Sequence, residues 1–176
     1  MQHDHIDWNQ YRDLCERLVA RVGASGWEFD SLLCLARGGM RPGDIFSRVY
    51  SKPLAIMTTS SYREAAGTVK GDLDIAKYIT GVSELKGKLL LVDDLCDSGA
   101  TIKKVVEHLK RNYPQITEIR VAVIWVKACS VFHPDYSVVQ YTDSPWIHQP
   151  FECYDDLGAE AFIEAIESGK TLGRLQ

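Results

Sequence analysis

Short apolar runs separated by amphipathic stretches organise the whole chain. Runs that are too short for a typical helix predict five buried strands, at residues 31–36, 53–59, 89–92, 118–127 and 136–141. Helical patterns predict four helices around them, at residues 8–22, 42–50, 102–111 and 159–170. Strands that alternate with helices imply an α/β fold, in which a mainly parallel sheet is flanked by helices on both faces.

Local signals indicate where two of these helices begin. Asp7 and Gln10 have the spacing of an N-cap and its reciprocal partner. Apolar residues then recur on one helical face, at Trp8, Tyr11, Cys15, Leu18 and Val22. Pro42 suits the first position of the second helix, because its fixed φ is helical. His3 and His5 precede the first helix, and we expect a frayed tail there rather than a metal-binding tract.

One long polar stretch interrupts the pattern. Residues 60–84 contain glycines at positions 67, 71 and 81. A segment of this length in a compact domain is usually functional, and we expect a flexible loop that closes over a ligand. The chain shows no internal repeat, so residues 1–176 are expected to form a single domain.

Three carboxylates lie where the central predicted strand ends and a helix begins. The run LLLVDDLCDSGAT, residues 89–101, places Asp93, Asp94 and Asp97 there. In open α/β sheets, this edge is where ligands bind. The small turn that follows consists of Ser98, Gly99, Ala100 and Thr101. Its backbone N–H groups and hydroxyls lie at a helix N-terminus and predict a site for a phosphate. A phosphate site beside carboxylates that can bind a diol matches a phosphorylated ribose as the ligand.

This run resembles the phosphoribosyl pyrophosphate (PRPP) binding motif of type I phosphoribosyltransferases. The resemblance extends over about residues 8–158 and implies the fold of that family, with a small base-binding hood at residues 142–158 and a flexible catalytic loop at residues 60–84. In the earlier run LARGGMRPG, Arg37 supplies a positive charge, and Gly38 and Gly39 let a ligand approach the main chain. The family holds pyrophosphate at this loop, often with a cis peptide between the residues at Ala36 and Arg37. Ser60, Ser61 and Tyr62 match the family's Ser-Ser-Tyr at the start of the catalytic loop, whose closure excludes water.

The base is expected to be bound by two later segments. Lys127 ends a predicted strand and can donate to the six-oxo group of a purine, the alternative being an ordinary surface lysine. The segment TDSPWIHQPFE, residues 142–152, resembles Trp-Ile-Glu-Gln-Pro-Trp-Asp of bacterial xanthine-guanine phosphoribosyltransferases. The resemblance implies that Trp146 stacks on the purine, that the Ile147 backbone contacts the two-position, and that Glu152 helps to hold magnesium.

Several positions depart from the family pattern. Ser98 replaces a threonine, Ala100 a common glycine and Ala128 a proline. His148 replaces an acid and Glu152 an aspartate, which leaves base preference and metal geometry open. Residues 159–176 lie past the resemblance and are expected to form a C-terminal helix that supplies packing or oligomer contacts.

The resemblance implies a Mg²⁺-dependent transfer of phosphoribose from PRPP to guanine, xanthine or hypoxanthine, in purine salvage. In this mechanism Asp93 and Asp94 hold the ribose hydroxyls, directly or through the metal, with Asp94 as a metal ligand. Asp97 acts as the catalytic carboxylate at the imidazole edge of the base, and the turn 98–101 binds the 5′-phosphate. Two alternatives remain, a nucleotide-binding regulator of the same fold and a phosphoribosyltransferase for a pyrimidine base.

The charge, the apolar runs and the cysteines narrow the class of protein and the compartment in which it works. The formal net charge of −4 argues against a general nucleic-acid surface, and no apolar run approaches the roughly 18 residues of a membrane span. The N-terminus has no basic region before an apolar one, so we expect no signal peptide. Five cysteines without a CxxC spacing favour a reducing cytoplasm. Cys96 in the ligand turn is either a reactive thiol or a small filler. The family commonly forms homodimers or homotetramers.

Overall fold

A mainly parallel sheet forms the body of the molecule. The computed structural model describes residues 2–61, 73–75, 79–155 and 157–169. The strand order is β4-β3-β2-β5-β7, and β6 and β8 both pair with β7. The strands are β2 (Ser31–Ala36), β3 (Leu54–Ser61), β4 (Leu73–Ile75), β5 (Gly87–Val92), β6 (Leu95–Cys96), β7 (Ile116–Val126) and β8 (Tyr136–Gln140). All pairs in this sheet are parallel except β3 with β4.

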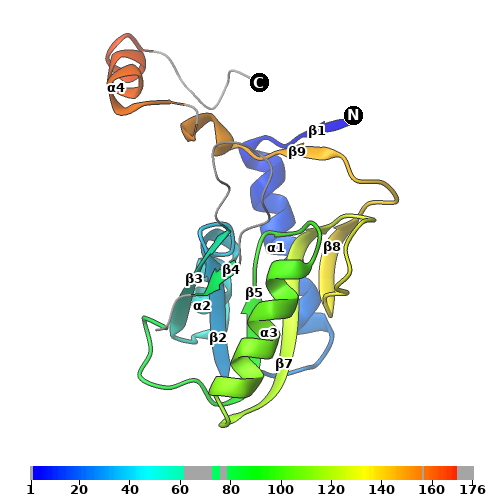
Figure 1. Ribbon diagram of the computed structural model, residues 1–176. Coiled ribbons are helices and arrows are strands. Elements are labelled where there is room, and N and C mark those ends of the chain that lie inside the picture. The colour runs from blue at the N-terminus through cyan, green and yellow to red at the C-terminus, as the bar shows by residue number, and fades with distance from the viewer. Residues whose placement is uncertain (1, 62–72, 76–78, 156, 170–176) are drawn as a thin grey trace.

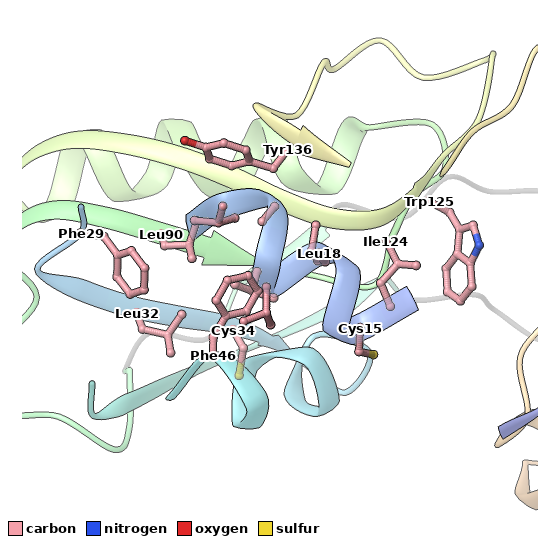
Figure 2. Packing of buried hydrophobic residues seen from close by; sticks show 14 of the residues in the cluster. Cys15, Leu18, Phe29, Leu32, Cys34, Phe46, Leu90, Ile124, Trp125 and Tyr136 are labelled. Atoms are coloured by element: carbon pink, nitrogen blue, oxygen red, sulfur yellow. The ribbon is translucent and has the colours of Figure 1, made fainter. Parts of the chain in front are cut away.

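Helices cover both faces of this sheet, as the alternating pattern predicts. The helices α1 (Trp8–Ala24) and α2 (Met40–Tyr50) pack on one face, and α3 (Ala100–Asn112) packs on the other (Figure 1). Successive residues of a strand point to opposite faces. Leu32 and Cys34 of β2 therefore face α1 and α2, whereas Leu33 and Leu35 face α3. Figure 2 shows the first of these two cores, in which Leu18 and Phe46 lie near Leu32 and Leu90.

A second, smaller pair of strands lies beyond one end of the main sheet. The strands β1 (His3–His5) and β9 (Trp146–His148) pair in parallel (Figure 1). A short 3-10 helix, η1 (Glu152–Tyr154), follows β9. We call β1, β9 and η1 the hood. The last helix, α4 (Ala159–Glu167), lies farther out than the hood (Figure 1).

The hood corrects two sequence-based expectations. His3 and His5 do not form a frayed tail, because β1 is held by backbone pairing with β9. Residues 146–148 are a strand rather than part of a continuous loop. Both strands have three residues, which is too short for the alternating pattern that identifies a strand from sequence.

Smaller differences concern element ends. The helix α2 begins at Met40, so Pro42 is its third residue; Gly39 already has helical angles, φ −68° and ψ −12°. At the start of α1, Trp8 is 38% exposed, while the other four residues of the predicted face are buried. The helix α4 ends at Glu167, three residues before the predicted end.

The predicted loop 60–84 is described only in part. Strand β3 continues through Ser61, where it pairs with Leu73 of β4. Tyr62 and most of the predicted loop lie outside the described residues. Within the part of the chain that the structure describes, no helix is long and apolar enough to cross a membrane.

Candidate active site

The carboxyl ends of β2 and β5 lie side by side and bring the two predicted PRPP segments together. Cys34 of β2 pairs with Val92 of β5, so the chain after each strand leaves at the same edge. The peptide between Ala36 and Arg37 is cis, as the resemblance implies. A side chain at Gly38 would collide with the carboxylate of Asp94, so these two segments are in direct contact. A glycine at this position lets the main chain pass against the carboxylate.

The backbone of the two central aspartates, Asp93 and Asp94, is held by the neighbouring strand β7. The Asp93 N–H donates to the Ala122 carbonyl at 3.1 Å. The Asp94 carbonyl accepts from the N–H groups of Ile124 and Trp125, at 2.9 and 3.1 Å. The Asp94 N–H donates to Oδ1 of Asp93 at 2.9 Å. Burial and the adjacent Asp94 carboxylate raise the pKa of Asp93 well above its ordinary range.

The turn before α3 has the geometry of an anion site. Gly99 has a φ of +75°, and a Cβ there would lie 2.6 Å from Ser130 Oγ and 2.7 Å from the Phe132 nitrogen. Glycine is therefore required at this position. Ala100 is the first residue of α3 and has no positive φ, so the family's usual glycine is not needed there. The first N–H groups of α3 have no partner within the helix and can donate hydrogen bonds to a phosphate.

Three residues predicted to bind and react with the base meet in one place. Lys127 Nζ lies 3.3 Å from Asp97 Oδ1 and 5.9 Å from the centroid of the Trp146 ring. The Lys127 side chain is only 9% exposed, whereas that of Asp97 is 55% exposed. Lys127 is thus not an ordinary surface lysine. A buried ammonium beside an open carboxylate and an exposed aromatic ring can hold a planar, polar ligand.

The hood holds Trp146 and Ile147 through backbone bonds. The Trp146 N–H donates to the Gln2 carbonyl at 2.8 Å, and the Ile6 N–H donates to the His148 carbonyl at 3.0 Å. Because alternate residues of a parallel strand bond to the same neighbour, the Ile147 N–H and carbonyl face away from β1. No backbone group of the described residues outside β1 bonds to them, so they can contact a ligand, while the Ile147 side chain is buried.

Glu152 contacts a histidine rather than the central aspartates. His148 Nδ1 lies 3.4 Å from Glu152 Oε2, and the His148 ring stacks on His5 at 4.3 Å and on His3 at 5.1 Å. Among the described residues, no three histidine, cysteine, aspartate or glutamate side chains gather as a metal site. Carboxylate oxygens such as those of Asp94 nevertheless suit Mg²⁺, which commonly binds through one or two carboxylates and substrate phosphates.

Two contacts at this edge involve residues that the sequence did not single out. Gln149 Nε2 donates to Asp94 Oδ2 at 2.8 Å. Arg37, which is 84% exposed, pairs with Asp155 at 3.1 Å. Gln149 lies inside the segment 142–152 that resembles the xanthine-guanine enzymes. The spacing of residues in the sequence predicts neither its contact with Asp94 nor the contact of Arg37 with Asp155.

The structure also answers the question about Cys96. Its side chain is 1% exposed, and its sulfur lies 3.1 Å from Ser130 Oγ. Burial raises the pKa of the Cys96 thiol, so it is a packed residue and not a reactive thiolate. The exposed cysteine near the site is Cys129, whose sulfur lies 3.7 Å from Asp97 Oδ1.

Comparisons with known proteins show which proteins this chain is similar to. The xanthine-guanine phosphoribosyltransferase of Idiomarina loihiensis is 25% identical over 150 residues, covering 85% of this chain and 86% of that protein. A purine phosphoribosyltransferase structure from Pyrococcus horikoshii is 26% identical, with a TM-score of 0.68, and the match covers 84% of this chain and 92% of that chain.

The Helicobacter pylori xanthine-guanine-hypoxanthine phosphoribosyltransferase has a TM-score of 0.68 at 21% identity, over 95% of this chain and 98% of that chain. This likeness shows the shared fold. The model of the phosphoribosyl transferase domain matches residues 7–156, which include the whole main sheet and the hood strand β9. The chain therefore belongs to the phosphoribosyltransferase family.

Proposed function

We propose that this protein is a purine phosphoribosyltransferase. It transfers the 5-phosphoribosyl group of PRPP to guanine, xanthine or hypoxanthine and releases the nucleoside monophosphate and pyrophosphate. The observation that carries this proposal is the buried Lys127 ammonium beside both Asp97 and the Trp146 ring. The purine and xanthine-guanine enzymes among the relatives support the same class of base.

The base-binding residues have complementary roles in this proposal. Trp146 stacks on the ring and the Ile147 backbone contacts the two-position substituent. Lys127 donates a hydrogen bond to the six-oxo group, since an ammonium only donates. Asp97 takes a proton from, or hydrogen-bonds, the imidazole edge, and general-base help of this kind contributes typically about 10²–10⁴-fold.

The other segments hold PRPP. Asp93 and Asp94 bind the ribose hydroxyls, and the turn formed by residues 98–101 binds the 5′-phosphate. Mg²⁺, held by Asp94 and substrate oxygens with Glu152 as a further candidate ligand, would neutralise charge on the leaving pyrophosphate.

The pyrophosphate loop consists of Arg37, Gly38 and Gly39. Arg37 can exchange Asp155 for pyrophosphate at small cost, because an exposed ion pair contributes only about 0–1 kcal/mol. In this proposal Ser60, Ser61 and Tyr62 form the start of the catalytic loop, whose closure over the substrates excludes water.

A pair of variants tests this assignment. With PRPP and Mg²⁺, the wild-type protein should use hypoxanthine and reject adenine. Lys127→Ala should lose this discrimination, because only the six-oxo group accepts a hydrogen bond from the ammonium. Trp146→Ala should weaken the binding of all oxopurines alike, by roughly 1–3 kcal/mol, since every base has a π-face on which the ring can stack.

Initial rates and apparent affinities for both bases measure these effects. If a Lys127→Ala enzyme still rejects adenine as strongly as the wild type, another residue recognises the six-position of the purine. A pyrimidine enzyme or a nucleotide-binding regulator would show no oxopurine turnover in the same assay.

We place this reaction in the cytoplasm, where the five unpaired cysteines would stay reduced. We also propose a homodimer or homotetramer, on the family resemblance. Light scattering on the purified protein measures the oligomeric state.

A further inference from the structure

Gln149 connects the hood to the carboxylate at the centre of the predicted PRPP site. It directly follows β9, and its side chain is only 7% exposed. Its Nε2 donates to Asp94 Oδ2 at 2.8 Å, across 55 positions of the chain. The residue is thus a buried polar side chain that reaches from the segment predicted to bind the base to the segment predicted to bind the sugar.

The chemistry of the contact determines how the amide is oriented. An ionised carboxylate only accepts hydrogen bonds, so the NH₂ group of Gln149 must face Asp94. Among the described residues, none donates to the buried Gln149 Oε1. The bond to Asp94 is therefore the one side-chain hydrogen bond that the described residues give this amide. Burial of a polar group for a single bond is costly, which indicates a role at Asp94.

The remaining contacts of Asp94 show what Gln149 adds. The backbone of Asp94 is held by β7, through Ile124 and Trp125. Its carboxylate packs against Gly38 on one side. The hydrogen bond from Gln149 restricts the carboxylate further without cancelling its charge. A lysine or arginine in this place would compete with a cation or with sugar hydroxyls, whereas a neutral donor leaves the anion available.

We propose that Gln149 is a positioning residue for PRPP binding. It holds the Asp94 carboxylate in the orientation that receives the ribose hydroxyls or their metal. This inference rests on the proposed function, since it assumes that Asp94 binds PRPP.

The test compares Gln149→Met with the wild-type protein. Methionine has nearly the same length and fills the same space but cannot donate a hydrogen bond. Partners that orient a ligating group typically contribute about 10–100-fold in affinity. We expect the Kd for Mg·PRPP, measured by calorimetry without any base, to rise by about that factor. The KM for PRPP should rise with it, while the KM for the base and the melting temperature stay unchanged.

Gln140→Met is the matched control. Gln140 is exposed, and its Nε2 donates to Ser137 Oγ at 3.0 Å within β8, outside the site. This variant should bind PRPP as wild type does. If Gln149→Met fails to fold, Gln149→Leu replaces it: leucine cannot donate a hydrogen bond either, so PRPP affinity should again fall.

The outcomes separate the inference from the function. Wild-type protein that binds no PRPP would overturn the proposed function and the inference together. Wild-type protein that binds PRPP, with a Gln149 variant that binds it equally well, would overturn the inference alone. Equal losses for PRPP and for the base would indicate a merely structural side chain and would also overturn it.

Discussion

Asp97 and Lys127 are the two single residues on which the proposed chemistry depends most. They come from the turn before α3 and from the end of β7, and they meet at 3.3 Å. Burial keeps the ammonium in place, while the carboxylate stays open to a ligand. A purine stacked on Trp146 would then find a donor for its six-position and an acceptor for its imidazole edge, which gives it one preferred orientation.

Asp97→Asn removes the charge of this carboxylate and keeps its size. We expect kcat to fall by about 100-fold or more, because the amide cannot accept the proton of the base. PRPP binding should be largely kept. Asp94→Asn is the contrasting variant and should weaken PRPP binding instead. Steady-state kinetics with a PRPP titration distinguish the two, and an Asp97→Asn enzyme with near wild-type kcat would refute the role of Asp97.

Single residues were predictable where an ordered motif contained them. Asp93, Asp94 and Asp97 lie at the sheet edge because an apolar strand precedes them and a helical pattern follows. The contact of Gln149 with Asp94 was not predictable, since no local pattern specifies a partner 55 residues away. For Glu152, the resemblance implies a metal ligand, but His148 stands where the family has an acid and takes up a contact with this carboxylate. Its metal role stays a prediction.

At the scale of elements, β1 pairs with β9, the strand proposed to bind the base. The chain's first residues thereby support a strand more than 140 positions later. Stacking of His3 and His5 with His148 adds side-chain contacts to the backbone bonds. The hood is therefore built from both ends of the chain, and the N-terminal strand is expected to affect base binding.

Deletion of residues 1–5 tests this expectation. Without β1, the Trp146 N–H loses the Gln2 carbonyl that accepts its hydrogen bond, and β9 loses its pairing with residues 3–5, at about 1 kcal/mol for each hydrogen bond. The KM for the purine should rise by roughly tenfold or more, while the Kd for Mg·PRPP changes little. His5→Ala is the control, since it removes a stacked ring and keeps the backbone pairing. Unchanged purine affinity in the shortened protein would show that β9 holds its place without β1.

The long strands of the main sheet were predictable, whereas its short strands β4 and β6 and the two strands of the hood were not. Buried strands such as β5 and β7 have long apolar runs, because helices cover both of their faces. The strands β1 and β9 have three residues each and depend on a distant partner for their bonds. The start of α2 differs by two residues because Met40 and Arg41 are already helical before Pro42.

At the scale of the whole molecule, the core between the sheet and the helices α1 and α2 contains two thiols that titrate differently in the folded and unfolded chain. Burial raises the pKa of Cys15 to about 11 and that of Cys34 to about 12, from an ordinary value of 9.0. Above pH 9 the unfolded chain loses these protons and the folded chain keeps them. The free energy of unfolding should therefore fall as pH rises from about 9 towards 11 or 12.

Cys34→Ala should make this fall less steep. Each thiol that stays protonated only in the folded state contributes up to about 1.4 kcal/mol per pH unit. Removing one should reduce the slope by up to that amount, whatever the variant costs in overall stability. Urea unfolding at several pH values between about 8 and 10, below the ordinary tyrosine pKa, measures the slope. If the free energy of unfolding falls with pH at the same slope in wild type and variant, Cys34 does not titrate in this way.

The α/β architecture as a whole follows from the order of the elements. Parallel strands need crossover connections, and helices in those connections must cover the sheet. This rule brings the carboxyl ends of β2 and β5 to one edge, and with them Arg37, Gly38, Asp93 and Asp94. How far the hood lies over that edge depends on contacts between distant segments, so it required the structure.

The most direct test of the account is the reaction itself. Purified protein with Mg²⁺ and PRPP should convert guanine, xanthine or hypoxanthine to the nucleoside monophosphate, with one pyrophosphate released per nucleotide. Orotate and uracil should give no product under the same conditions. Turnover of orotate or uracil without any oxopurine product would contradict the purine assignment. PRPP binding without turnover of any base would contradict the assignment of an enzyme.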